Sequence, residues 1–186
     1  MKKIMFNDKY GLTLAVLEGR KTQTRRTFLK PGEETLLDGI TPEYLISVRS
    51  RYKVGETIAI AQSYKDIHAE ILREVGDLDL KKEFLQSKGY ANKMFVRAEK
   101  MPHAIRITNI RIERLQDISE EDCMKEGLEW AHGLFYVNYN KDTGSRMNLG
   151  NTPREAFAAL IDRISGKGTW ARNPYVFVYD FELTKI

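Results

Sequence analysis

The chain has 186 residues, with 30 Lys and Arg against 26 Asp and Glu, and a formal net charge of +4. A chain of this length can form a buried core without the help of a disulfide or a metal. An internal disulfide is excluded because Cys123 is the single cysteine. No apolar run has the length of a membrane span, so we expect a cytoplasmic protein with no membrane partner. The moderate positive charge permits a nucleic-acid partner without requiring one.

Residues 17–26 form the most informative segment, and a predicted helix precedes them. The capping residues Asn7 and Asp8 precede an apolar run that ends before Gly19, which predicts a short helix that stops at this glycine. The next residues predict a strand, whose alternation places Lys21, Gln23 and Arg25 on one face and Thr22, Thr24 and Arg26 on the other. Neither face is apolar, which favours a ligand-facing role. A solvated edge strand that carries charges against aggregation is the alternative.

Turn signals and apolar runs define the next elements. Residues 28–50 carry Pro–Gly and Asp–Gly pairs and predict an irregular excursion. Residues 57–61 are β-branched or small and predict a buried strand, with Tyr64 just beyond its end. Residues 66–87 show a helical spacing of apolar side chains that is broken once, so they predict two short surface helices.

The middle of the chain predicts two strands and a helix. The strands are expected at 93–99 and 104–115, and the second has a phase shift near Asn109 that indicates a bulge. Ser119 is an N-cap with an acidic residue at the capping-box spacing, so a helix should start there and end at Gly127.

The last third of the chain completes the predicted fold. Residues 128–150 have no clear period and predict a long loop, which is a candidate lid or binding loop. A helix is expected from Thr152 to Gly166, and residues 175–183 predict a closing strand. Strands of mixed length with helices at the crossings predict one α+β domain over residues 1–186, built round a curved sheet or small barrel.

Several kinds of site are disfavoured by the sequence. The three histidines are scattered and no cysteine pair exists, so we expect no metal site and no cofactor. The segment 166–169 is rich in glycine, but it follows a helix instead of preceding one, which disfavours a phosphate-binding loop.

The remaining candidates for a catalytic or binding site are Lys21 and the hydroxyls of Thr22 and Thr24. A lysine in a partly closed cleft can act as a base, and a threonine becomes a nucleophile when such a base lies beside it. The same cations and hydroxyls, with Arg25 and Arg26, are equally able to hold phosphate groups. The residues alone leave both interpretations open.

The segment 18–26, followed by 52–56, resembles the G-x-K-x-x-x-x-R signature and the K-x-G-D/E turn of the ASCH domain family, relatives of the PUA RNA-binding domain. Residues 115–127 and 175–183 resemble the strand-then-helix part and the closing strand of that family. The resemblance implies a small PUA-like mixed β-barrel with flanking helices, and a cleft for RNA or a modified nucleoside beside the first helix. The extra material relative to the compact members of the family lies at about 27–50, 65–92 and 128–150.

One enzymatic branch of that family, the bacterial N4-acetylcytidine amidohydrolases, uses a lysine, a threonine and a glutamate. The matching positions here are Lys21, Thr24 and Glu126. The resemblance implies that Lys21 activates Thr24 or water against an acyl carbon, while Glu126 orients it or relays the proton. The chain departs from the branch at Arg25, where the branch carries an aliphatic residue.

A wider set of residues is expected to bind the ligand or RNA: Arg20, Thr22, Arg25, Arg26, Tyr64, Trp130, Trp170 and Arg172. Trp130 could stack on a base or instead seal an edge of the core. We therefore expect an RNA- or nucleoside-binding protein, with hydrolysis of an acyl amide as the sharper form of this prediction. The alternative is a protein-interaction or phage-associated accessory module. The sequence indicates neither the natural ligand nor the oligomeric state.

Overall fold

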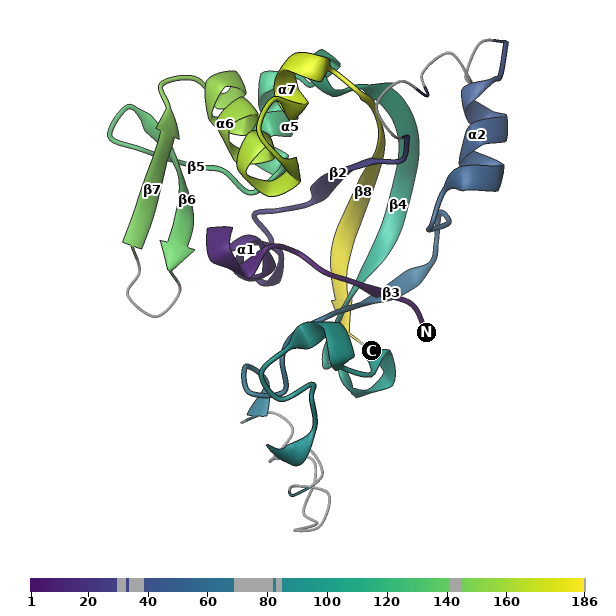
Figure 1. The fold of residues 1–186 in the computed structure, drawn as a ribbon, viewed down its shortest axis with the longest axis vertical. Coiled ribbons are helices and arrows are strands. Elements are labelled where there is room, and N and C mark those ends of the chain that lie inside the picture. Colours follow the sequence, from purple (N-terminus) through teal and green to yellow (C-terminus); the bar gives the residue numbers. More distant parts are fainter. Residues whose placement is uncertain (30–32, 34–38, 69–81, 83–84, 141–144, 186) are drawn as a thin grey trace. The chain divides into compact units, whose positions relative to one another are not determined.

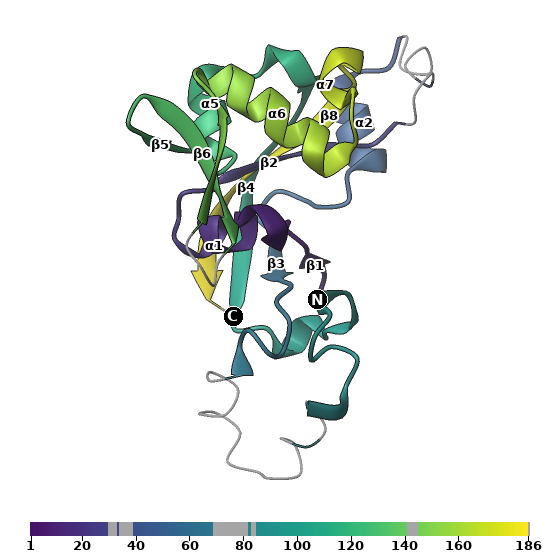
Figure 2. The same ribbon diagram turned by 60° about the vertical axis from the view of Figure 1, so that its left-hand side comes forward.

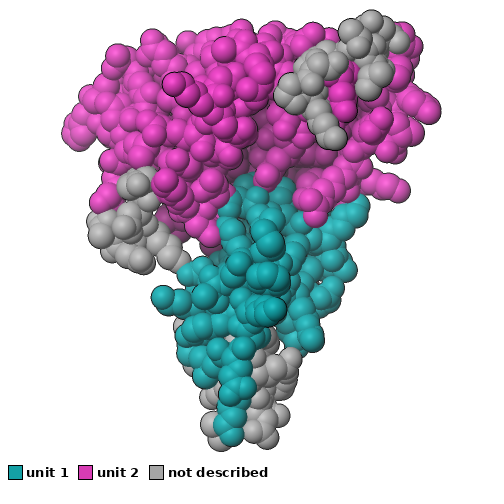
Figure 3. All heavy atoms as spheres, in the orientation of Figure 1, with its two compact units in different colours: residues 1–6, 57–106, 183–186 teal, residues 7–56, 107–182 magenta. Residues whose placement is uncertain are grey.

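The computed structural model describes residues 1–29, 33, 39–68, 82, 85–140 and 145–185. Within these residues the fold is a mixed α+β arrangement of five α-helices and two sheets, and the described strands do not close into a barrel. The predicted α+β class is therefore confirmed. The chain divides into two compact units, which Figure 3 distinguishes by colour.

Unit 1 comprises residues 1–6, 57–106 and 183–186. Strand β1 (Lys3–Ile4) pairs in parallel with β3 (Thr57–Ile60), and β3 pairs antiparallel with the start of β4 (His103–Arg114). β3 was expected from its β-branched and small residues, and β4 from its alternating isoleucines, whereas β1 was not predicted. Their core contains Ala59, Ala61, Tyr64, Ile67, Val96, Ala98 and Met101.

The strand predicted at 93–99 is wrong. This segment forms two short 3-10 helices, η3 (Lys93–Phe95) and η4 (Ala98–Lys100). The side chain of Asn92 accepts a hydrogen bond from the Met94 N–H at 2.9 Å, which starts a turn where a strand would need its ladder partner. The two helices predicted within 66–87 lie for the most part outside the described residues.

Unit 2 comprises residues 7–56 and 107–182 and contains Lys21 and the cations that follow it. The predicted first helix is present in two parts, η1 (Asp8–Tyr10) and α1 (Leu12–Leu17). Gly11 separates them with a φ of 63°, and a Cβ at this position would lie 2.7 Å from the Cβ of Asn138. Gly19 ends the helix with a φ of 74°, as its position predicted.

The long strands of unit 2 pair with one another. β2 (Gln23–Thr27) pairs antiparallel with β8 (Tyr175–Lys185), from Gln23 opposite Asp180 to Thr27 opposite Val176. The full strand order is β1-β3-β4-β8-β2, and Figures 1 and 2 both show β2, β8 and β4 next to one another. The buried positions of β4 shift from Ile105 and Ile107 to Ile110, which confirms the predicted change of phase.

Two segments predicted as irregular contain regular structure. Residues 42–49 form α2 (Pro42–Arg49), capped by the Thr41 side chain, inside the expected excursion at 28–50. Residues 128–150 form a three-stranded sheet of β5 (Glu129–Ala131), β6 (Leu134–Asn140) and β7 (Ser145–Gly150) instead of a long loop. Two register shifts in the β6–β7 ladder break the alternation of apolar residues, so the sequence shows no strand period.

The remaining helices form as predicted. Ser119 caps α5 (Glu120–Lys125) by accepting the Asp122 N–H at 3.1 Å, and Gly127 follows the helix with a φ of 100°. Thr152 caps α6 (Pro153–Ser165), which packs against β7, α5 and the short helix α7 (Thr169–Arg172). The packing of α6 holds α5 in place above β2, where the candidate site lies.

Candidate functional site

The side chains of β2 alternate as expected, and one face is directed to α5. Lys21, Gln23 and Arg25 all make hydrogen bonds on this side of the strand. The backbone is fixed as well, because the Thr22 N–H donates to the Lys125 carbonyl at 3.0 Å. The polar face of the predicted strand is thus covered by a helix, so its cations are buried instead of solvated.

Lys21 and Glu126, which are 105 positions apart, form a buried ion pair. The Lys21 amine donates to Glu126 Oε2 at 2.5 Å, to the Glu126 carbonyl at 3.0 Å and to the Gln23 carbonyl at 2.7 Å. Three acceptors match the three N–H groups of an ammonium. Only 2% of Lys21 and 5% of Glu126 is exposed. Burial lowers the pKa of Lys21 from its ordinary value, and the charge of Glu126 opposes this shift.

The Glu126 carboxylate also pairs with a second cation, Arg25. Its guanidinium donates to Glu126 Oε1 at 3.0 Å, to Glu113 Oε1 at 2.7 Å and to Asp122 Oδ2 at 3.2 Å, and it also contacts the side-chain oxygen of Gln23. Burial alone would lower its pKa, but Glu126 and Glu113 outweigh this effect and raise it. Arg25 therefore stays charged, and it joins β2, β4 and α5 at one point.

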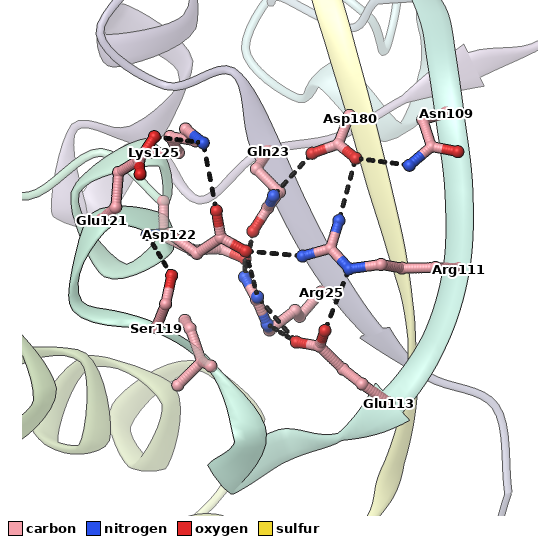
Figure 4. A network of polar contacts seen from close by, with 12 residues as sticks. Gln23, Arg25, Asn109, Arg111, Glu113, Ser119, Glu121, Asp122, Lys125 and Asp180 are labelled. Carbon is pink, nitrogen blue, oxygen red and sulfur yellow. Dashed lines mark hydrogen bonds and ion pairs between the residues drawn. The ribbon is translucent and has the colours of Figure 1, made fainter.

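A further layer of polar side chains surrounds Arg25 (Figure 4). Arg111 donates to Asp122 at 2.5 Å, to Asp180 at 2.9 Å and to Glu113 at 3.0 Å. Asp180 in turn accepts from the Gln23 amide at 2.5 Å. Burial raises the pKa of Asp122, but its hydrogen bond with Lys125 and the charges of Arg111 and Arg25 together lower it. Each carboxylate of this network forms an ion pair with at least one cation.

An open hollow of about 730 Å³ lies in the same unit, next to the C-terminal end of α5. We call it the α5–β5 hollow. Its charged lining residues are three acidic and three basic ones, namely Glu18, Glu121, Glu129, Arg20, Lys125 and Arg146. Trp130 and Asn138 also line it, and 63% of Trp130 is exposed.

The charges of the hollow are paired with each other. Arg20 contacts Glu18 at 2.5 Å and Glu129 at 3.0 Å, and Arg146 lies 3.5 Å from Glu129. The Asn138 amide donates to Glu129 Oε1 at 2.9 Å. The lining as a whole carries no net charge at neutral pH.

The predicted catalytic residues are brought together in part. Lys21 and Glu126 meet, whereas Thr24 lies between Gln23 and Arg25 in β2, so its side chain projects from the opposite face of the strand. Thr24 is buried, opposite Tyr179 of β8. The catalytic roles of these residues remain predictions.

The other predicted binding residues lie in several places. Arg20 and Trp130 line the hollow, and Arg25 belongs to the buried network. The Thr22 backbone joins α5 and β8, and Arg26 is exposed. Tyr64 belongs to the core of unit 1, where its hydroxyl accepts the Arg97 N–H at 2.9 Å.

Trp170 and Arg172 lie in α7. The Trp170 ring packs edge-on against Phe157, with centroids 6.1 Å apart, and the Arg154 guanidinium lies 5.3 Å from it. Arg172 is exposed and donates to the Thr169 hydroxyl at 3.1 Å. Their contacts are therefore those of a helix packed against α6.

Sequence reasoning missed Glu113, Asp122 and Asp180 in the network, and Glu129, Asn138 and Arg146 in the hollow. The only sequence signal for the first group is the run of cations within residues 20–26, which require carboxylates from elsewhere if they are buried. The second group lies on strands that the sequence did not reveal.

The described residues contain no cluster of His, Cys, Asp and Glu that could hold a metal ion, and none of their helices is long and apolar enough to cross a membrane. A scan against protein-family models and searches of curated proteins and solved structures gave no match to the chain.

Proposed function

We propose that the protein binds a nucleoside in the α5–β5 hollow. The observation that carries the proposal is a hollow of about 730 Å³ that combines an exposed tryptophan with paired acidic and basic side chains. Small-molecule sites in proteins typically have volumes of about 300–1,000 Å³, so a nucleoside fits this space. A tryptophan that is 63% exposed at its rim offers a surface on which a base can stack.

The charge of the hollow favours a nucleoside over RNA. A protein that binds the RNA backbone does so with cations that are free to neutralise phosphates. Here Arg20, Lys125 and Arg146 are each within 3.5 Å of a carboxylate. A phosphate would have to displace these carboxylates, whereas an uncharged nucleoside would not.

The buried ion pair has a positioning role in this proposal. Glu126 lies between Lys125 and Leu128, which both line the hollow, and its side chain is fixed by Lys21 and Arg25. The pair therefore sets the position of the wall where α5 ends and β5 begins.

The family that we propose is ASCH, with a PUA-like architecture in which the described strands form an open sheet, and with the cytoplasm as its location. Support comes from the signature segment, where the helix stops at Gly19 and Lys21 enters a buried site. Cys123 is buried, and burial raises the pKa of its thiol to about 11, which suits a structural cysteine in a reducing compartment.

The sharper form of the proposal is hydrolysis of an acyl amide on a modified nucleoside. It is supported by the 2.5 Å approach of Lys21 to Glu126, the two residues that the amidohydrolase resemblance implied. Water is the nucleophile in this form, because Thr24 projects from the other face of β2. Lys21 can accept the proton of that water only if the Glu126 side chain moves, since just 2% of the lysine is exposed.

Calorimetric titration with a panel of nucleosides tests the proposal. We expect binding by the wild type and a loss of about tenfold in affinity for Trp130→Ala, because one stacked base contributes roughly 1–3 kcal/mol. Trp170→Ala is the matched control, since it removes the chain's other tryptophan, which lies in α7. Equal losses in the two variants, or no binding by the wild type, would reject the hollow as the site.

Two further arms separate the alternatives. Titration of short RNAs at two salt concentrations should show no tight, salt-sensitive binding; if it does, RNA is the ligand instead. Incubation with acylated nucleosides tests hydrolysis, which must disappear in Lys21→Met if this lysine is the base. A protein that responds in none of these assays is better explained as an accessory module.

A further inference from the structure

Glu129 stands out among the side chains of the α5–β5 hollow because its two carboxylate oxygens have unequal partners. Oε1 accepts from the Asn138 amide at 2.9 Å and from Arg20 at 3.0 Å. Among the described residues, Oε2 has only the 3.5 Å contact with Arg146. A carboxylate oxygen accepts two hydrogen bonds, so Oε2 has capacity for a ligand. With 16% of the side chain exposed, this oxygen is partly covered but accessible from the hollow.

The partners of Glu129 also fix its orientation. The Asn138 amide must direct its nitrogen to the carboxylate, because a carboxylate has no proton to donate. Arg20 is itself held by Glu18, through two hydrogen bonds at 2.9 and 2.5 Å. The carboxylate is therefore held from two sides before a ligand arrives, which reduces the entropy lost on binding.

We propose that Glu129 selects nucleosides whose base carries an exocyclic amine. This inference rests on the proposed function of the hollow and adds its specificity. An amine donates a hydrogen bond to Oε2, whereas a carbonyl at the same place meets an acceptor and loses its own hydrogen bond to water. Adenosine and cytidine meet this requirement, and their counterparts inosine and uridine carry the carbonyl.

Calorimetric titration of two matched pairs, adenosine with inosine and cytidine with uridine, tests the inference. In the wild type we expect the amine-bearing member of each pair to bind about tenfold more tightly, which corresponds to one hydrogen bond to a charged group. Glu129→Gln should reduce the preference to about twofold, because a glutamine amide can present either a donor or an acceptor. Glu121→Gln is the control, since Glu121 lines the same hollow with 80% of its side chain exposed.

The outcomes separate this inference from the proposed function. Equal affinity within each wild-type pair overturns the role of Glu129 but leaves nucleoside binding intact. An unchanged preference in Glu129→Gln also overturns it. No measurable binding of any nucleoside rejects the proposed function together with the inference. The wild-type ratios are informative even if Glu129→Gln does not fold.

Discussion

Replacing Glu126 by glutamine keeps the shape of the side chain and removes the charge that serves two buried cations. Lys21 loses its ion pair at 2.5 Å and Arg25 loses one at 3.0 Å. Removal of one member of a buried ion pair costs about 3–5 kcal/mol, because the other charge stays buried without compensation. Arg25 retains Glu113 and Asp122, so we expect a loss near the lower end of that range.

Urea unfolding followed by circular dichroism measures this loss. A decrease of about 3 kcal/mol in a chain of this size corresponds to a fall in melting temperature of roughly 6–12 °C. Glu120→Gln is the control, because Glu120 is exposed in the same helix and its loss should cost under about 0.5 kcal/mol. If Glu126→Gln unfolds within about 0.5 kcal/mol of the wild type, the pair does not stabilise the fold in the way described.

Two other predictions concern Lys21 and the glycine that follows Glu126. Burial lowers the folded-state pKa of Lys21 below its ordinary 10.5. At pH values between the folded-state pKa and 10.5, the unfolded chain keeps a proton on Lys21 that the folded chain has lost. The free energy of unfolding of the wild type, measured relative to that of Lys21→Met, should therefore rise with pH towards 10.5. A difference that does not change with pH would contradict this prediction. Gly127→Ala should cost about 1 kcal/mol more than Gly166→Ala in the same urea assay. Both glycines have φ near 100°, but only at Gly127 would a Cβ meet Ala15 and Lys21, at 3.3 Å, so equal costs would exclude crowding.

Local chemistry explains which elements were predictable from the sequence. Ser119 and Thr152 cap their helices by hydrogen bonds that span three residues, and Gly19 ends a helix through its own φ. The alternation in β2 also follows from local geometry, so the common face of Lys21 and Arg25 was predicted correctly.

Non-local pairing explains what could not be predicted. Arg25 is surrounded by carboxylates that lie 88 and 97 positions away, in Glu113 and Asp122. The sequence states only that such cations need partners, and it does not state which carboxylates supply them. The sheet of residues 128–150 was missed because its bulges remove the period that identifies a strand.

Arg25 has a consequence for function that follows from this arrangement. Its guanidinium donates to Glu126 Oε1, whereas Lys21 donates to Oε2 of the same carboxylate. Each Glu126 oxygen accepts from a cation, and only 5% of the residue is exposed, so a water has no access to the remaining lone pairs unless the side chain moves. Arg25 therefore fixes the Glu126 side chain between β2 and α5. This arrangement favours a protein that binds its ligand in the adjacent hollow over one that hydrolyses the ligand at the ion pair.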